Sequence, residues 1–302
     1  MNSRWILTML VLIGLLLGGC RKAALAPTPT LPVATTTPTE TSQPASATPR
    51  PSATPTLAAT PTATIYPTGT MTLTPQPIRR TPPTLMLHRK NTSFDSVQFL
   101  KDFILILKQN KMRVITYEDI RKNPEITSRE QGKLFIISID DLYLRYPIDP
   151  SVLEMIALLR QAGYPAVLGV VTESDYAYPE TLKTYRELSA AGWEIASHTD
   201  RHSNLGVMER TAPRYVYTEV QTSVDKIQKA VGVRPYTLIL PDGQMVNDPR
   251  FIKRAGIVWI VGINGGNTYD SRKDMVYVGR EGPEGSAGQT FRIMMGRFNP
   301  GH

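Results

Sequence analysis

The sequence has a single cysteine, Cys20, in 302 residues, and this excludes a fold held together by intramolecular disulfide bonds. It has no long transmembrane segment, since the apolar run at residues 6–17 falls short of the ~20 residues that a membrane-spanning helix needs. The net charge of +8 is spread unevenly, because residues 1–83 supply five of these charges and the remainder has no dense Lys/Arg run. We therefore do not expect the protein to bind nucleic acid.

The N-terminal segment has the layout of a processed leader. Arg4 precedes the apolar run, and the residues Leu-Gly-Gly lie directly before Cys20. This pattern resembles a bacterial lipoprotein signal, in which the peptide is cut before the cysteine and the thiol is lipidated. An ordinary secretory signal and an uncleaved anchor are the alternatives. The resemblance implies an extracytoplasmic protein that is anchored to the bacterial cell membrane through a lipid on Cys20.

A long stretch after this signal is rich in proline and threonine. Residues 27–83 contain 14 of the 25 prolines, and such a composition offers too little apolar surface to offset the entropy of ordering. We therefore predict a signal peptide at residues 1–20, a disordered Pro/Thr-rich linker at 21–83 and one folded domain at 84–302. The linker is expected to serve as an extended spacer.

Short apolar runs alternate with amphipathic stretches from Thr84 onwards. The predicted strands cover residues 85–87, 114–115, 134–137, 166–171, 193–197, 238–240 and 257–261. The predicted helices cover residues 94–107, 150–162, 179–191, 216–227 and 249–255. This alternation favours an α/β fold in which helices cover a parallel sheet. An open doubly wound sheet and a closed barrel both fit, and in either of them functional groups gather at the carboxyl ends of the strands.

Side chains with useful chemistry follow these strands. Asp140 and Asp141 end one apolar strand, His198 and His202 follow another, and His88 ends the first. On a helical turn, histidines four residues apart present both rings on one face, where both can bind one cation. Two imidazoles and a carboxylate suit zinc or a similar divalent metal, and they leave a coordination position open for hydrolytic chemistry. An Asp pair often caps a helix and two histidines can coincide by chance, but their joint position at strand ends favours a metal site.

Both motifs resemble those of a known family. The stretch Ser-Ile-Asp-Asp at 138–141 is similar to the Thr-Phe-Asp-Asp motif of NodB-homology polysaccharide deacetylases, carbohydrate esterase family 4. The stretch His-Thr-Asp-Arg-His at 198–202 resembles their His-Ser/Thr-x-x-His motif, and Leu-Ile-Leu-Pro-Asp-Gly at 238–243 falls where their third motif lies. The resemblance covers about residues 85–261. It implies an irregular (β/α) barrel of parallel strands surrounded by helices.

The resemblance also implies a reaction. Asp141, His198 and His202 would hold a divalent metal, with zinc expected, and Asp140 would be the general base that deprotonates a metal-bound water. The substrate implied is an N-acetylated polysaccharide of the N-acetylglucosamine type, from which the enzyme removes acetyl groups. The chain is expected to act as a monomer.

Other family positions are only partly matched. The backbone amide of Asp242 would stabilise the oxyanion, and Thr199 would orient a histidine or shape the turn. Ile239 stands where the family has the arginine that orients the base, and the late Leu-x-His motif that supplies an acid is absent. His88 resembles the first-strand histidine of the poly-N-acetylglucosamine deacetylase branch, where that residue joins the active site. A structural hydrogen-bonding role is the alternative for His88.

Three functions follow from these observations. The leading hypothesis is a metal-dependent deacetylase that acts on an envelope or extracellular polysaccharide. The alternative is a catalytically impaired pseudoenzyme that binds glycans. It is suggested by the absence of the third-motif arginine and of the late histidine motif. An amidohydrolase with a small-molecule substrate is the third hypothesis.

Overall fold

The computed structural model describes one folded unit of the chain. The described residues are 79–142, 148–175, 178–263, 266–269 and 273–298. The chain divides into two units, Met1–Gly69 and Thr70–His302, and every described residue lies in the second. Residues 1–78, which include Cys20 and most of the predicted linker, lie outside the described residues, so the predictions about them stay predictions. The predicted boundary at residue 84 is wrong, because Arg79–Arg80 form β1 and residues 81–83 are buried against the domain.

The unit consists of strands that alternate with helices along the chain. The strands are β1 (Arg79–Arg80), β2 (Thr84–His88), β3 (Arg113–Val114), β4 (Leu134–Asp140), β5 (Val167–Val170), β6 (Glu194–Ser197), β7 (Thr237–Ile239), β8 (Trp259–Gly262), β9 (Thr268–Tyr269) and β10 (Val276–Gly279). The helices are α1 (Ser96–Gln109), α2 (Tyr117–Lys122), α3 (Ile126–Arg129), α4 (Pro150–Ala162), α5 (Thr172–Asp175), α6 (Pro179–Ala190), α7 (Leu205–Thr211), α8 (Arg214–Val231), the 3₁₀ turn η1 (Pro241–Gly243), α9 (Arg250–Arg254) and α10 (Ala287–Phe298).

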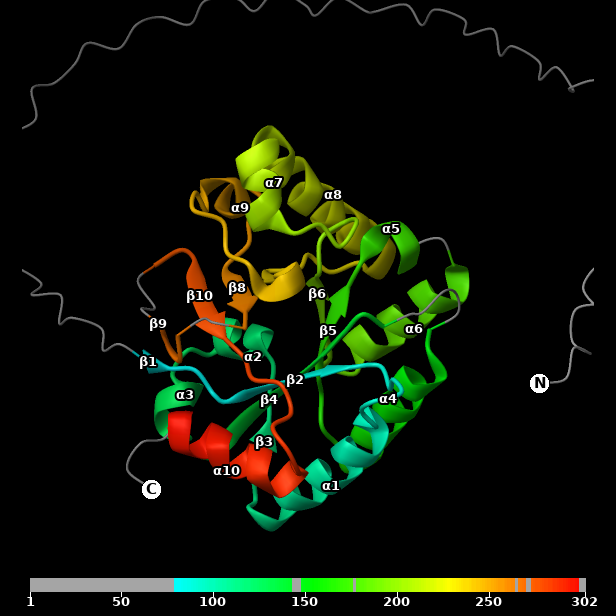
Figure 1. Ribbon diagram of the computed structural model, residues 1–302, viewed down its shortest axis with the longest axis vertical. Helices are drawn as coiled ribbons and strands as arrows, with labels where there is room; N and C mark the ends of the chain where they lie inside the picture. Colours follow the sequence, from blue (N-terminus) through cyan, green and yellow to red (C-terminus); the bar gives the residue numbers. More distant parts are fainter. Residues whose placement is uncertain (1–78, 143–147, 176–177, 264–265, 270–272, 299–302) are drawn as a thin grey trace, which may run out of the picture. The chain divides into compact units, whose positions relative to one another are not determined.

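The main sheet is parallel throughout. Its strand order is β10-β8-β7-β6-β5-β4-β2, and β3 pairs with β4 beside this path. The short strands β1 and β9 form a separate antiparallel pair. Figure 1 shows the strands at the centre of the domain, with α1, α4, α6 and α8 arranged around them. The predicted α/β class with parallel strands surrounded by helices is confirmed.

The sheet curls until its two outermost strands approach each other. The chain that follows β10 lies beside β2, where Met86 N–H donates to Glu281 O at 2.8 Å and Glu281 N–H donates to Thr84 O at 2.9 Å. A parallel bridge also joins Leu85 to Glu281. These contacts decide between the two architectures that the sequence left open, and they favour the irregular barrel over the open sheet.

Strand β4 shows how the sequence produces this arrangement. Every residue of its Leu-Phe-Ile-Ile-Ser-Ile-Asp sequence is buried, because apolar groups cover both faces of the strand. Successive side chains of a strand point to opposite faces. Phe135, Ile137 and Ile139 belong to the core shared with α1 and α4, whereas Ile136 belongs to the core that includes residues of β7 and β8. Asp140, which shares a face with Ile136, is therefore directed into the barrel.

The helices begin and end at residues that the sequence marks. Asp149 caps α4 by accepting a hydrogen bond from Ser151 N–H, Pro150 occupies its first turn, and Gly163 ends it in the left-handed conformation. The predicted helix 94–107 corresponds to α1, which begins and ends two residues later, and the predicted helix 216–227 corresponds to α8, which is longer at both ends. Helices α2, α7 and α10 and strand β10 have no counterpart among the elements predicted from the sequence.

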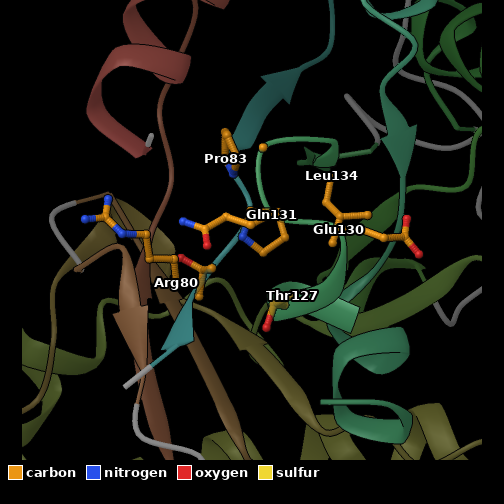
Figure 2. Close-up of a pocket in the computed structure, with 9 residues that line it drawn as sticks. Arg80, Pro83, Thr127, Glu130, Gln131 and Leu134 are labelled. Carbon is orange, nitrogen blue, oxygen red and sulfur yellow. The ribbon is translucent and has the colours of Figure 1, made fainter. Parts of the chain in front are cut away.

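A small pocket lies at the opposite end of the barrel from the strand ends that carry the polar residues. It has a cavity volume of about 10 Å³, which is room for about one water molecule. Figure 2 shows Arg80, Pro83, Thr127 and Leu134 around it, close to the starts of β2 and β4. Its size and position make it unsuitable as a substrate site. Among the described residues, no helix is long and apolar enough to cross a membrane.

Candidate metal and hydrolase site

The predicted site residues meet at the carboxyl ends of β2, β4 and β6. Strand register places His88 beside Asp140, Asp140 beside Gly169, and Val170 beside Ser197, which directly precedes His198. Residues far apart in the sequence are thus brought to one edge of the barrel. This edge is where parallel α/β folds place their functional groups.

Asp141, His198 and His202 converge on one point. One potential ligand atom from each residue lies within 4.8 Å of the others. Asp141 Oδ1 is 3.7 Å from His198 Nε2 and 3.2 Å from His202 Nε2. Ligands at ~2.05 Å from a tetrahedral zinc ion are separated by about 3.3 Å, and the two distances from Asp141 Oδ1 are close to this spacing. The donor set of two imidazoles and one carboxylate fits as well.

The hydrogen bond at the far side of the His198 ring supports this interpretation. His198 is 2% exposed, and its Nδ1 lies 3.0 Å from the backbone carbonyl oxygen of Ile239. Because a carbonyl oxygen only accepts, Nδ1 carries the proton and Nε2 is left with a free lone pair. Histidines that bind metals are commonly oriented by such a bond. Burial also lowers the pKa of His198, which favours the neutral ring that a metal requires.

The two other members of the triad are hydrogen-bonded to each other. Burial alone would raise the pKa of Asp141, but the hydrogen bond from His202 and the nearby imidazoles outweigh it and hold that pKa at about 2. The same hydrogen bond raises the pKa of His202. Asp141 is therefore ionised over the physiological pH range, as a metal ligand must be.

The loop that carries the two histidines departs from the expected geometry. The helical turn that the spacing of His198 and His202 predicts is not formed, and these residues lie in an irregular loop between β6 and α7. Thr199 shapes this loop, since its N–H donates to Ser197 Oγ and its Oγ1 accepts from Ser203 N–H. The ring centroids of the histidines are 4.7 Å apart. The irregular loop therefore brings the two imidazole rings together, as the predicted helical turn would also have done.

A buried carboxylate anchors the middle of this loop. Asp200 is 5% exposed, and its Oδ1 lies 2.6 Å both from Thr172 Oγ1 and from Lys226 Nζ. Thr172 N–H also donates to the Thr199 carbonyl oxygen. These contacts tie the histidine loop to α5 and α8. We infer that they fix the position of the two imidazoles.

Asp140 is the most buried acidic group of the site. Its side chain is 1% exposed, and its Oδ2 lies 2.5 Å from Nη1 of Arg280, whose side chain is 2% exposed. The same Nη1 donates to Ser138 Oγ at 3.1 Å. Arg280 is not among the site residues predicted from the sequence, because it follows β10, which has no predicted counterpart, and lies outside the stretch that resembles the family motifs. The sequence itself gives no local signal for this pairing.

His88 lies at the open side of the two aspartates. Its Nε2 is 4.0 Å from Asp140 Oδ2 and 3.8 Å from Asp141 Oδ2, and its side chain is 43% exposed. The ring is therefore part of the cluster and is also open to solvent.

Asp242 lies in the tight turn η1 after β7. Its side-chain Oδ2 accepts a hydrogen bond from Asn204 Nδ2 at 3.1 Å, and its negative charge contributes to the raised pKa of His202. Asp242 has a φ of 55° within this turn. The turn thus faces the histidine loop, as the predicted third-motif position requires.

Unusual backbone conformations gather at this site. Among the described residues, the non-glycine positions with positive φ are Asp141, Thr199, His202, Asp242 and Lys111, and four of these five belong to the site. Such conformations cost on the order of 1–3 kcal/mol each and persist where the surrounding structure enforces them. Their clustering coincides with the residues that the sequence predicts for the site.

Comparison with known proteins agrees with this description. Residues 127–257 match the sequence model of the polysaccharide deacetylase family. No curated protein sequence matches the chain. The domain resembles the Streptococcus pyogenes deacetylase PplD in complex with acetate, with 17% identity, 72% of this chain and 99% of that chain covered, and a TM-score of 0.58.

Two further solved structures share the fold. A de-N-acetylase from Aggregatibacter actinomycetemcomitans is 18% identical, with 70% of this chain and 98% of that chain covered and a TM-score of 0.57. IcaB from Ammonifex degensii is 14% identical, with 72% and 97% covered and a TM-score of 0.56. The domain therefore has the fold of these deacetylases, and the segment that matches the family model contains Asp140, Asp141, His198 and His202.

Proposed function

We propose that the domain is a metal-dependent hydrolase that removes N-acetyl groups from an N-acetylglucosamine-type polysaccharide of the envelope or the extracellular space. The observation that carries this proposal is the convergence of Asp141, His198 and His202 beside the buried Asp140 carboxylate. A divalent cation held by these three side chains, with zinc favoured by the donor set, would polarise the acetamide carbonyl and make a water molecule more acidic.

The side chains of the site divide the proton transfers between them. Asp140 accepts the proton of the attacking water, which it can do because its carboxylate directly adjoins Asp141 and faces into the barrel. His88 lies 4.0 Å from Asp140 and is partly exposed, so it can deliver a proton to the leaving amine. The backbone N–H of Asp242 donates to the oxyanion of the tetrahedral intermediate. His198, held by Ile239, keeps its free nitrogen directed at the metal position.

The surface beside the site favours a polymer over a small molecule. An open hollow of about 1000 Å³ adjoins the histidine loop, and its walls include Asn204, Tyr215 and Asp242. A small-molecule amidohydrolase would instead be expected to have a short, closed cleft. The hollow supports a substrate that extends beyond the acetylated sugar.

The test of this proposal is acetate release. Purified protein is incubated with β-1,6-linked N-acetylglucosamine polymer, peptidoglycan glycan and chitin-like oligomers, with chelator and after zinc is restored. We expect release that chelator abolishes, and a loss of at least about 100-fold for Asp140→Asn. Asp102→Asn, on the exposed face of α1, is the matched control and should retain full activity. No release from any of these glycans by zinc-loaded protein would contradict the proposal.

The alternative is a pseudoenzyme that binds glycans without turnover. Ile239 in place of the family arginine and the absence of the late histidine motif support it. It predicts that wild type and Asp140→Asn bind the glycans equally and that neither releases acetate. Measurements of glycan binding and of acetate release with wild type and Asp140→Asn therefore distinguish the two functions.

We also propose where the protein acts. The N-terminal sequence supports a signal peptide at residues 1–20, lipidation of Cys20 and a Pro/Thr-rich tether from residue 21 up to the start of β1, which carries the domain outside the cytoplasm. Cys20→Ser should move the protein from the membrane fraction to the soluble fraction of the expressing bacterium. Retention of this variant in the membrane would contradict the lipid anchor.

A further inference from the structure

The buried ion pair between Asp140 and Arg280 connects the site to a part of the chain outside the segment that matches the family model. We propose that Arg280 is the positioning residue that holds the Asp140 carboxylate for proton transfer, in place of the arginine that the third motif lacks. This inference rests on the proposed function, because it assigns a partner to the base of that reaction.

The closure of the barrel fixes where Arg280 lies. Arg280 follows β10 directly, and its backbone N–H donates to Gly262 O at 3.0 Å. The next residue, Glu281, is hydrogen-bonded to Thr84 and Met86 of β2. Backbone bonds to strands on both sides therefore hold Arg280 at the seam between β8 and β2. From this seam the side chain enters the barrel and reaches the end of β4.

The guanidinium contacts one side of the Asp140 carboxylate. Its Nη1 is 2.5 Å from Asp140 Oδ2 and 3.1 Å from Ser138 Oγ, and both charged side chains are almost fully buried. In such surroundings an ion pair is weakly screened by solvent, and removal of either partner leaves an uncompensated charge. The carboxylate cannot turn away from Arg280 without this penalty.

A glycine closes the other side. Gly169 is the strand neighbour of Asp140, and a Cβ atom at Gly169 would lie 2.8 Å from Asp140 Oδ1. Hence the carboxylate fits into this space only because residue 169 has no side chain. Arg280 on one side and the glycine backbone on the other define a single orientation for the two oxygens. A base that is held in one orientation beside the metal ligands needs no reorganisation before it accepts a proton.

A purely structural ion pair would have different consequences. It would contribute to folding stability, and its loss would lower substrate turnover only in proportion to the loss of folded protein. A positioning role predicts a loss of turnover in protein that is folded and still binds zinc. Arg79 provides the matched control, because it is also buried and paired with an acid, Glu125, but lies away from the site.

The experiment compares Arg280→Gln, Arg280→Lys and Arg79→Gln with wild type for acetate release, zinc content and melting temperature. We expect Arg280→Gln to lower kcat about 100-fold, to leave KM within about 3-fold and to retain one equivalent of zinc. Arg280→Lys keeps the charge and should lose only about 10-fold. Arg79→Gln should melt at a lower temperature with unchanged kcat. A kcat of Arg280→Gln within 3-fold of an active wild type would overturn the inference.

Gly169→Ala tests the same orientation from the other side without altering Arg280. The added methyl group displaces Asp140, so kcat should fall at least about 10-fold while zinc content is retained. Full activity of this variant would contradict the fixed orientation of the carboxylate.

A measurement of stability separates this inference from the proposed function. If wild type releases no acetate, the function fails, but the pairing still predicts coupling between Asp140 and Arg280. Arg280→Gln should then lower the melting temperature at least twice as much in the wild-type background as in the Asp140→Asn background. Equal losses in both backgrounds would overturn the pairing even in an inactive protein.

Discussion

Glu194 provides a test of the electrostatics that is independent of the proposed site. It begins β6, at the opposite end of the strand from His198, and is 9% exposed. Its Oε2 accepts a hydrogen bond from Glu118 N–H at 2.9 Å. Burial, aided by the negative charges of Glu118 and Asp119, raises the pKa of Glu194 from 4.5 to about 7. The folded protein therefore binds a proton at this position more tightly than the unfolded chain does.

The sign of the pH dependence follows from this difference. Below pH 4.5 Glu194 is protonated in both states and contributes no pH dependence. Between pH 4.5 and 7 the folded state retains the proton that the unfolded state has lost, so the free energy of unfolding decreases as the pH rises. A shift of this size corresponds to a total loss of about 3 kcal/mol, at 1.36 kcal/mol for each pH unit. Above pH 7 the loss is complete and constant.

The substitution Glu194→Gln removes the titration but keeps an oxygen that can accept the hydrogen bond from Glu118. We expect the variant to match wild type near pH 4.5 and to exceed it by up to about 3 kcal/mol at pH 8. Urea unfolding between pH 4.5 and 8.5 measures this difference, and Glu154→Gln, on an exposed carboxylate, serves as the control. Acetate release should be unchanged, because Glu194 is remote from the strand ends that form the site. Identical pH dependence in wild type and Glu194→Gln would refute the reasoning.

Two further substitutions test the turn and the loop that shape the site. Gly243 has a φ of 66°, and a Cβ atom there would lie 2.2 Å from Ile263 Cγ1. Gly243→Ala should therefore destabilise the domain by about 3 kcal/mol and lower its melting temperature by roughly 10 °C. An unchanged melting curve would contradict this packing. Lys226→Met removes the ion-pair partner of Asp200, which anchors the histidine loop. It should lower the free energy of unfolding by about 2 kcal/mol and weaken zinc binding about 10-fold. Calorimetry that shows wild-type zinc affinity would contradict the anchoring role.

Much of the fold could be predicted from the sequence because local signals agree with the tertiary structure. The continuous apolar residues of β4 and the Pro150 and Gly163 boundaries of α4 identify these elements without knowledge of their neighbours. The choice between open sheet and barrel had no such signal. It depends on the backbone bonds between Glu281 and β2, which join the two ends of the sheet and leave no periodic pattern in the sequence.

The site also has features that the sequence predicts and features that depend on the tertiary structure. Asp141, His198 and His202 could be proposed from their position after apolar strands, since parallel strands bring such residues to one edge. The backbone conformation that makes them converge could not be predicted, because the positive φ at Thr199 is imposed by its surroundings rather than by its residue type. Arg280 was missed for a related reason, since its pairing with a residue of β4 arises only when the barrel closes.

Asp141, His198 and His202 are proposed to bind one metal ion together. Calorimetric titration of metal-free protein with zinc tests this claim most directly, with His198→Ala and His88→Ala as variants. We expect one equivalent to bind to wild type and to His88→Ala, because His88 is not among the three converging ligands, and a loss of binding in His198→Ala of at least about 100-fold. Zinc binding to His198→Ala with wild-type stoichiometry and affinity, or no binding to wild type, would contradict the account.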